Sequence, residues 1–482
     1  MIDLRPVGYV IGLLVASLGA SMLVPMSIDL IYRNGHWPVF LNAAVISILT
    51  GGLVALSSVN ATTARLSLQQ TFLLTTLVWV ALPVFGALPF LFSPLEADVT
   101  DAFFEAMSGM TTTGSTAFSG LDDFPEGLLL WRSMLQWFGG IGIVVVAMVF
   151  LPELRVGGMQ IFRSEAFDTM GKILPRAAEI ASQISWIYVV LTMLCFLSYL
   201  TLGMSSFDAI NHALTTVSTG GFSTTDASFG AFQGPPEYVA SIFMVLASLP
   251  FVRYIQLVSG TARPFFRDSQ IHAYLLVITS MAVVLALFQI VEDERGFEES
   301  LREAFFNVTS IISGTGYASV DYQLWGSFAM VVFFFIGLIG GCAGSTCCSV
   351  KIFRYQILMS AIATQIRRIH SPHGVFAPKF DDRRVSEEVL SSVMAFFVLF
   401  VVSLGVLSVS LGMTGLDFVT ATSGAATAIG NIGPGLGPII GPSGYFGPLN
   451  DGAKWLLIAG MLVGRLELMA VYVLFTTAFW RG

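Results

Sequence analysis

Charged residues are scarce in this sequence. Lysine, arginine, aspartate and glutamate together make up 11% of its 482 residues, whereas hydrophobic residues make up 55%. Because soluble domains carry about 25% charged residues, this composition excludes an ordinary soluble globular protein. The chain is expected to be an integral membrane protein.

Cysteine is scarce too, and clusters of catalytic or metal-binding residues are missing. The four cysteines, Cys195, Cys342, Cys347 and Cys348, lie in or beside apolar segments, so a disulfide framework is not expected. The last three have no histidine or carboxylate near them and match a metal site poorly. Because the sequence has no intramembrane aspartate pair and no Ser–His arrangement of plausible spacing, it argues against a membrane-embedded enzyme.

Long apolar runs are abundant. Ten of them approach or exceed the roughly 20 residues that a helix needs to cross a bilayer. They cover residues 7–31, 39–56, 67–92, 131–151, 185–202, 239–258, 273–291, 324–339, 389–411 and 455–479. The sequence therefore predicts an all-α polytopic membrane protein with ten transmembrane helices.

The few charges are distributed unevenly between the two sides of this ten-span arrangement. Sixteen of the 23 basic residues fall on the side of the two termini, and five fall on the other side. The positive-inside rule then places both termini in the cytoplasm. The opposite face is acidic, and an acidic outer mouth raises the local concentration of cations.

Four glycine-centred loops are the main functional signal. They read Thr112-Thr113-Gly114-Ser115, Ser218-Thr219-Gly220-Gly221, Gly314-Thr315-Gly316-Tyr317 and Asn431-Ile432-Gly433-Pro434-Gly435, with proposed anchors at Gly114, Gly220, Gly316 and Gly433. Each loop follows a short segment that is long enough for half a membrane crossing, near 102–112, 207–217, 302–312 and 418–428. This pattern predicts a ring of neutral backbone carbonyls that would replace the water around a potassium ion, with no carboxylate in the loops.

The loops divide the chain into four similar units. A span, a short helix, a loop and a second span together end on the side where they began, so four such repeats are parallel and can surround one pseudo-fourfold pore. The predicted organisation is two N-terminal transmembrane helices in 1–66, then pore repeats in 67–155, 178–260, 270–355 and 385–482.

The last span contains Arg465 and Glu467 near its centre. An arginine in mid-membrane costs about 2.5–3.5 kcal/mol on insertion scales, so it is expected to face protein or water. We favour an Arg465 that points into the pore below the filter, over an ion pair with another span. Glu467 lies on a different face of the helix and is not its obvious partner. Arg253, near the end of its span, is given no role.

The eighth span ends in ten small residues. They are Gly340, Gly341, Cys342, Ala343, Gly344, Ser345, Thr346, Cys347, Cys348 and Ser349. Small residues often mean close helix packing, but three glycines in such a run favour a broken helix that lines a cavity beneath the filter. The segment is predicted to act as a gate.

The longest cytoplasmic loop, roughly 355–386, carries a group of basic residues. Either positive-inside topology or docking of a cytosolic partner explains them, and docking is favoured. The basic residues and the histidine and proline residues among them are Arg367, Arg368, Lys379, Arg383, Arg384, His370, Pro372, His373 and Pro378. The His370 and His373 pair is a weak metal signal.

Several long motifs closely resemble the TrkH-type potassium-uptake subunits of the Trk/Ktr/HKT superfamily of cation transporters. They are the run Gly340–Thr346, the loop from Asn431 to Gly437, and the C-terminal strings Ala453-Lys454-Trp455, Gly464-Arg465-Leu466-Glu467 and Phe479-Trp480-Arg481. The resemblance covers essentially the whole chain. It departs at Cys347-Cys348-Ser349, where the family's gating loops continue with a glycine triplet.

The resemblance implies a homodimer in the bacterial inner membrane with one pore in each protomer. Potassium would be held by carbonyls of a filter made from Thr112, Thr113, Gly114, Ser218, Thr219, Gly220, Gly314, Thr315, Gly316, Asn431, Ile432 and Gly433. Gly340–Ser349 would be the intramembrane gating loop and Arg465 the pore cation. The family's partner is a cytosolic TrkA-type ring that binds NAD(H) or ATP/ADP; no nucleic acid and no covalent cofactor are expected.

Two further functions stay open at this point. One is a secondary transporter that couples potassium to sodium or protons, since discontinuous helices also suit that class. The other is a sodium-permeable relative.

Overall fold

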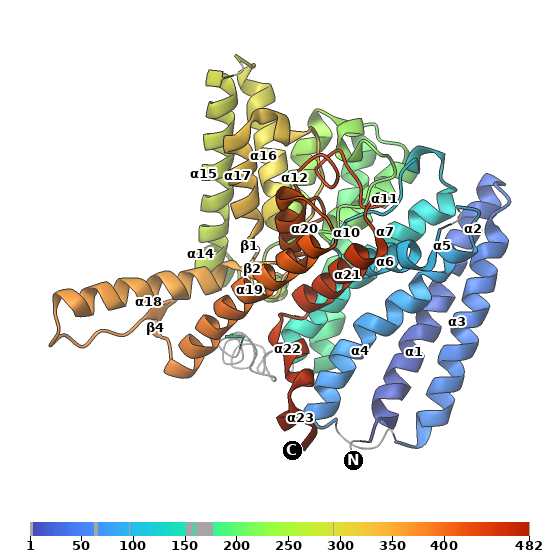
Figure 1. Ribbon diagram of the computed structural model, residues 1–482, viewed down its shortest axis with the longest axis horizontal. Helices are drawn as coiled ribbons and strands as arrows, with labels where there is room; N and C mark the ends of the chain where they lie inside the picture. The colour runs from blue at the N-terminus through green and yellow to red at the C-terminus, as the bar shows by residue number, and fades with distance from the viewer. Residues whose placement is uncertain are drawn as a thin grey trace.

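The computed structural model describes residues 3–61, 66–95, 97–150, 158–159, 177–292 and 294–481. Some residues used in the predictions lie outside these ranges. They include five of the sixteen basic residues counted on the cytoplasmic side, the acidic Asp293 on the opposite side, and the last five residues of the first pore repeat. The five basic residues are Arg65, Arg155, Arg163, Lys172 and Arg176. Figure 1 shows a bundle of helices around shorter helices at its centre.

The first two spans form a hairpin beside the rest of the bundle. Helices α1 (Arg5–Ser21) and α2 (Leu23–Tyr32) together make one span, and α3 (Trp37–Ser58) returns. Gly12 and Gly51 let the two helices meet, because a Cβ on either glycine would lie 2.6 Å from the carbonyl oxygen of the other. Small residues provide such close packing where lipid offers no hydrophobic driving force.

Each of the four following units has a short helix between longer ones, as the repeat pattern predicts. The helices are α4 (Leu68–Gly86), α5 (Leu88–Phe92), α6 (Val99–Met110) and α7 (Glu126–Val145); α10 (Ala177–Thr201), α11 (Ser206–Val217), α12 (Pro235–Ala247) and α13 (Phe251–Val258); α14 (Arg263–Arg267), α15 (Ser269–Glu292), α16 (Phe297–Ser313) and α17 (Ser327–Gly337); and α19 (Glu387–Met413), α20 (Phe418–Gly430), α21 (Asp451–Arg465), α22 (Met469–Tyr472) and α23 (Thr477–Arg481). Short 3-10 or π turns continue or link them: η1 (Val59–Ala61), η2 (Leu121–Asp123), η3 (Val146–Phe150), η4 (Ser228–Phe232), η5 (Tyr322–Trp325) and η6 (Val473–Phe475).

The short helices α6, α11, α16 and α20 match the four predicted half-length segments. Side chains cap three of their N-termini: Asp98 accepts from the Asp101 amide at 2.7 Å, Ser205 from Asp208 at 3.0 Å, and Asp417 from Val419 at 3.0 Å. Their C-terminal ends lead into the four glycine loops. The negative ends of four helix dipoles therefore lie next to the loops, which favours a cation there.

The fold class is confirmed, but the number of ten continuous spans is not. Within the described residues, seven helical segments are long and apolar enough to cross a membrane. Two predicted spans are bent pairs instead: α12 and α13 meet at 88°, and α21 with the α22 segment at 105°. The eighth span is also shorter than predicted, since α17 has 11 residues. Pro250 directly precedes α13, and the second break lies between Arg465, which ends α21, and Met469, which begins α22.

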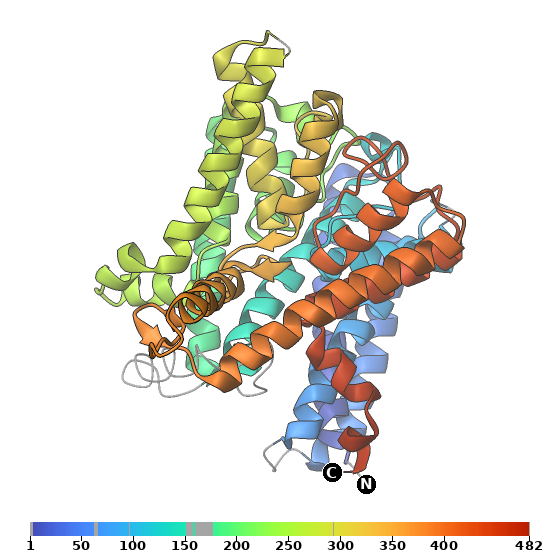
Figure 2. The same cartoon turned by 60° about the vertical axis from the view of Figure 1, so that its left-hand side comes forward.

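The prediction of a loop at 355–386 is wrong, because most of this segment has regular secondary structure. Residues Ile352–His370 form α18, a 19-residue helix, and β3 (Lys379–Phe380) pairs antiparallel with β4 (Arg383–Arg384). The helical stretch has no glycine or proline, and basic residues in its last turn complement the helix dipole. Figure 1 shows α18 extending sideways from the bundle, and Figure 2 shows it nearly end-on beside α19.

Candidate selectivity filter and gate

The four glycine loops meet in a closed ring. A Cβ built on one glycine of each loop would collide with, or crowd, a carbonyl oxygen of the next loop, and the fourth loop returns to the first. The pairs are Gly114 with Gly220 (2.2 Å), Gly221 with Thr315 (1.8 Å), Gly316 with Ile432 (2.0 Å) and Gly433 with Thr113 (2.9 Å). Loops that are about 100 residues or more apart in sequence therefore lie against one another through backbone alone.

Backbone hydrogen bonds fix which residues are equivalent in the four loops. In each repeat one amide donates to the carbonyl five residues earlier: Thr113 to Ser108, Gly220 to Thr215, Thr315 to Ser310 and Ile432 to Thr427, at 2.8–3.1 Å. The next residue has a positive φ in all four, namely Gly114 (83°), Gly221 (80°), Gly316 (80°) and Gly433 (111°). The anchor of the second loop is thus Gly221, and its assignment to Gly220 is one residue early. The sequence offers a Gly-Gly pair there and cannot show which glycine has the positive φ.

The position two residues before each anchor is also left-handed. It is occupied by Thr112, Thr219, Gly314 and Asn431, with φ between 49° and 73°. Three of these are not glycine, and residues held in such a conformation carry strain that the surrounding structure must support. Ser218, the first residue assigned to the second loop, caps the C-terminus of α11.

Buried polar side chains hold the chain where it leaves each loop. Nine residues before the anchors of the first three repeats stand Glu105, His212 and Asn307; Ser423 acts similarly in the fourth. Their partners are the Ala117 amide (2.9 Å), Ser223 Oγ (3.0 Å), Ser319 Oγ (3.0 Å) and the Leu436 amide (2.8 Å), respectively. Sequence reasoning missed this set, although a polar residue eight or nine positions before each of the first three predicted anchors was a usable signal.

A wide cavity opens on one side of the ring. Its volume is about 290 Å³, and its lining includes all four anchors identified by the backbone, Gly114, Gly221, Gly316 and Gly433. Arg132 also lines it, but its Nε donates to Glu105 Oε1 at 2.7 Å, and both side chains are almost fully buried. This pairing compensates a positive charge that would otherwise repel cations from this cavity, called the vestibule below.

On the other side, the small-residue segment Gly340–Ser349 leaves the helical path entirely. It begins in β1 (Ile339–Gly340), which pairs in parallel with β2 (Val350–Lys351). Between them the chain bonds to the α12–α13 break: the Cys342 amide donates to Ser248 O at 3.0 Å, and the Phe251 amide donates to Gly344 O at 2.9 Å. The predicted broken helix is confirmed. The break in α12–α13, which was not predicted, satisfies backbone groups of the segment at membrane depth.

This segment lies directly against the inner ends of two filter loops. The Thr219 hydroxyl donates to Thr346 Oγ1 at 3.2 Å, and Thr112 Oγ1 lies 4.0 Å from the Cys348 sulfur. A cavity lined by Ser345, Cys348 and Arg465 has a volume of only about 20 Å³. That is close to the space one water molecule needs.

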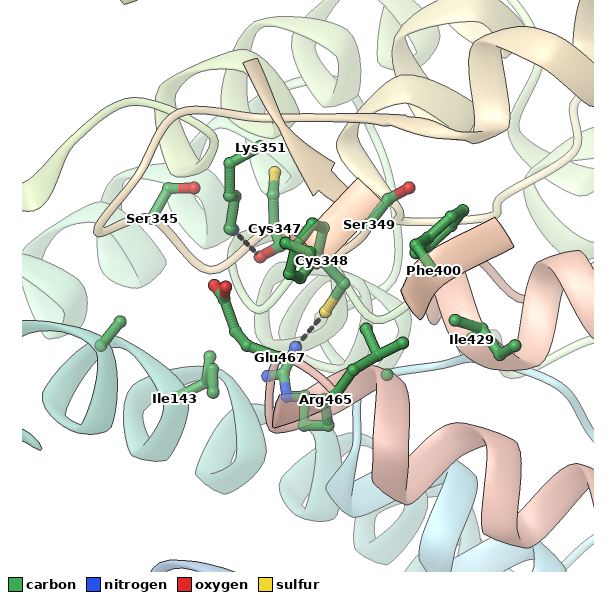
Figure 3. A pocket seen from close by; sticks show the side chains of 14 residues that line it. Ile143, Ser345, Cys347, Cys348, Ser349, Lys351, Phe400, Ile429, Arg465 and Glu467 are labelled. Carbon is green, nitrogen blue, oxygen red and sulfur yellow. Dashed lines mark hydrogen bonds between the residues drawn. The ribbon is translucent and has the colours of Figure 1, made fainter. Parts of the chain in front are cut away.

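Arg465 lies beneath the filter, and Figure 3 shows it facing Cys348. Its Nη1 donates to the Cys348 sulfur and, at 3.4 Å, to Thr346 O, while Nη2 donates to Gly139 O at 3.0 Å. Among the described residues it has no carboxylate partner, because Glu467 pairs with Arg354 of α18. The structure thus brings Arg465 to the position favoured from sequence, although it contacts the small-residue segment rather than an open pore.

Arg253, which was given no role, is paired. Its Nε donates to Asp268 Oδ2 at 2.6 Å, next to the start of α15. The pair joins the second repeat to the third near the small-residue segment, since the neighbouring Gln270 accepts from the Ala343 amide at 3.0 Å.

A ring of backbone loops inside a helical bundle, with a wide cavity on one side and the small-residue segment on the other, defines a membrane pore protein for small ions. Residues 36–481 match the TrkH family model, described as a cation transport protein. The chain therefore belongs to the TrkH family, and it is a multi-pass membrane protein.

Named relatives agree with this assignment. The chain is 43% identical to the Trk system potassium uptake protein TrkI of Halomonas elongata over 414 residues, which cover 86% of this chain and 84% of that protein. It is 36% identical to the Trk system potassium uptake protein TrkH of Escherichia coli K12, over 99% of both chains. The crystal structure of the potassium transporter TrkH from Vibrio parahaemolyticus superposes with a TM-score of 0.92 at 32% identity, covering 100% of both chains.

Proposed function

We propose that this protein carries potassium into the cell through the ring formed by the four loops. The observation that carries the proposal is the closed chain of backbone contacts between Gly114, Gly221, Gly316 and Gly433 and the carbonyl oxygens of neighbouring loops. Neutral carbonyl dipoles compensate for the lost hydration of a monovalent cation. The names of the relatives support potassium as that cation.

The proposed path has three parts. A cation enters the vestibule of about 290 Å³, passes the filter, and meets the gating loop Gly340–Ser349 and Arg465 at the inner end. Flux requires the gating loop to leave its sites against Thr112 and Thr219. While the loop is in place, Arg465 would limit how strongly cations occupy the inner end, because like charges repel through a medium of low dielectric constant.

Reconstitution into liposomes tests the function. With a potassium gradient alone, potassium should move in response to voltage, and sodium should move more slowly. If flux instead demands an opposing or accompanying gradient of sodium or protons, the protein is a coupled secondary transporter. If sodium moves as fast as potassium, the carbonyl ring does not select.

Regulation and assembly follow from the same proposal. A homodimer is expected to present two copies of α18 and the β3–β4 hairpin to the cytoplasm, and a TrkA-type ring is expected to dock there. NAD(H) or ATP/ADP would bind to that ring, not to this chain. Support comes from the exposed basic residues Arg367, Arg383 and Arg384 on an arm that begins directly after the gating loop. A partner that binds the two gate states unequally would shift the gate.

A further inference from the structure

The thiol of Cys348 lies where three functional parts of the molecule meet. Cys348 belongs to the gating loop, its sulfur accepts a hydrogen bond from Arg465, and it lies 4.0 Å from Thr112 Oγ1 of the first filter loop. A Cβ on Gly314 of the third filter loop would lie 3.7 Å from the Cys348 amide nitrogen. Gate, pore cation and filter thus share one contact point.

Arg465 depends on the gating loop for much of its hydrogen bonding. Two of its acceptors, Cys348 Sγ and Thr346 O, belong to that loop, and only Gly139 O comes from α7. Its carbon Cζ also lies 5.3 Å from the ring centre of Trp79. Among the described residues its Nε has no hydrogen-bond partner. Because the guanidinium has so few acceptors, the loss of any one of them should change its position.

We propose that Cys348 is a positioning residue that holds Arg465 against the inner end of the filter while the gate is closed. The inference rests on the proposed pore function. When the gating loop withdraws, it takes the Cys348 and Thr346 acceptors with it, so Arg465 is released in the same step. Steric block and positive charge then leave the cation path together.

The neighbouring thiol supplies a contrast. Cys347 is also part of the gating loop and also buried, but its sulfur donates to Ser248 Oγ at 2.8 Å, on the side of the α12–α13 break. Figure 3 shows the two side chains pointing apart, with the Arg465 contact made by Cys348. Cys347 therefore fastens the loop without touching Arg465.

The test is a double-mutant cycle on potassium flux from liposomes, with no cytosolic partner present. The variants are Cys348→Ala, Arg465→Gln and the double substitution, with Cys347→Ala in the same background as the matched control. Cys348→Ala should raise basal flux roughly tenfold, the order expected for one hydrogen bond to a charged group. Adding Arg465→Gln should then raise it little further, because both changes remove the same barrier.

The control pair should behave differently. Cys347→Ala loosens the loop independently of Arg465, so its effect and that of Arg465→Gln should multiply. Cys348→Ser keeps a hydrogen-bond acceptor and should restore most of the low basal flux. Potassium over sodium preference should stay unchanged in every variant, because no filter carbonyl is altered.

Multiplicative effects of Cys348→Ala and Arg465→Gln would overturn the proposal, as would equal flux in Cys348→Ser and Cys348→Ala. If Cys348→Ala does not yield monodisperse protein, Cys348→Val replaces it both in the cycle and in the comparison with Cys348→Ser. Absence of potassium flux in wild type and in all variants would instead contradict the proposed function itself. The two failures are therefore distinguishable.

Discussion

At the residue scale, glycine is required in the filter where a side chain would strike the backbone of the next loop. Gly221 combines a φ of 80° with a contact of 1.8 Å between its built Cβ and Thr315 O. Gly120 has nearly the same φ, 75°, but nothing lies within 4 Å of its Cβ position. Substituting each glycine in turn therefore distinguishes the cost of backbone strain, which both positions share, from a distortion of the filter ring, which is expected only at Gly221.

We expect Gly221→Ala to lower the preference for potassium over sodium, because the added methyl group must displace the Thr315 carbonyl. Gly120→Ala is the matched control. It should cost about 1–2 kcal/mol in stability from its left-handed conformation, yet leave ion preference unchanged. The measurement is the ratio of potassium to sodium flux in liposomes, beside thermal unfolding in detergent. Equal ratios in both variants would remove Gly221 from the filter.

The Glu105–Arg132 pair gives a second prediction at this scale. Both side chains are at most 1% exposed, so Glu105→Gln leaves an unpaired buried cation, and it also weakens the anchor on the Ala117 amide. We expect a loss of about 3–5 kcal/mol in unfolding free energy. Asp3→Asn, which breaks the exposed pair with Arg5, is the control and should leave the melting temperature unchanged. Similar melting temperatures for both variants would contradict the structural role of Glu105.

The sequence predicts which residues form the filter loops more readily than it predicts which residues are equivalent in the four repeats. The three positions around each loop glycine are visible as a repeated pattern of Thr-Gly and Asn-Ile-Gly. The choice between Gly220 and Gly221 depends on the φ angles and on the hydrogen bond from the Gly220 amide to Thr215 O. Neither can be read from the identities of the residues.

At the element scale, the sequence analysis did not predict the bends in the two broken spans. Hydropathy reads 239–258 and 455–479 as continuous apolar runs, yet they bend by 88° and 105°. Both bends have tertiary partners: the gating loop bonds to the first, and Arg465 and Arg354 make contacts at the second. The half-length helices were predictable because length and flanking loops define them locally.

The arm formed by α18 and the β3–β4 hairpin gives a prediction about docking. Replacing Arg367, Arg383 and Arg384 by glutamine should weaken co-purification with a TrkA-type ring at least severalfold and remove nucleotide control of flux, because salt-sensitive charge pairs would be lost. Arg368 is left intact, since its Nη2 donates to Phe376 O at 2.7 Å and holds the arm together.

The matched control for the arm is a double glutamine substitution of Arg263 and Arg267 in α14, a short helix that also carries basic residues. It should retain partner binding. If both sets of substitutions weaken binding equally, the arm has no special part in docking and general surface charge accounts for the attraction.

At the scale of the whole molecule, the structure places the start of α1 and the whole of α23 at one end of the bundle, as both overall views show. Gly203, between α10 and α11, has open space around it, and His373 follows the end of α18. With the positive-inside assignment, we expect Gly203→Cys to react with a membrane-impermeant maleimide from outside intact cells. His373→Cys should react only after the membrane is opened. The reverse pattern would invert the topology; the four buried native cysteines provide the unlabelled background.

The filter ring has a property that concerns chain connectivity. Its contacts run from the first loop to the fourth and back to the first, so no loop is an end. Asp3 and Phe479, near the two termini, are both held by α4, through Gln70 at 2.7 Å and Gln69 at 2.6 Å. A short linker between the termini, with new ends cut at an exposed turn such as Gly203, would therefore keep every neighbour of the ring in place. The order in which the repeats are translated is separable from the arrangement in which they assemble.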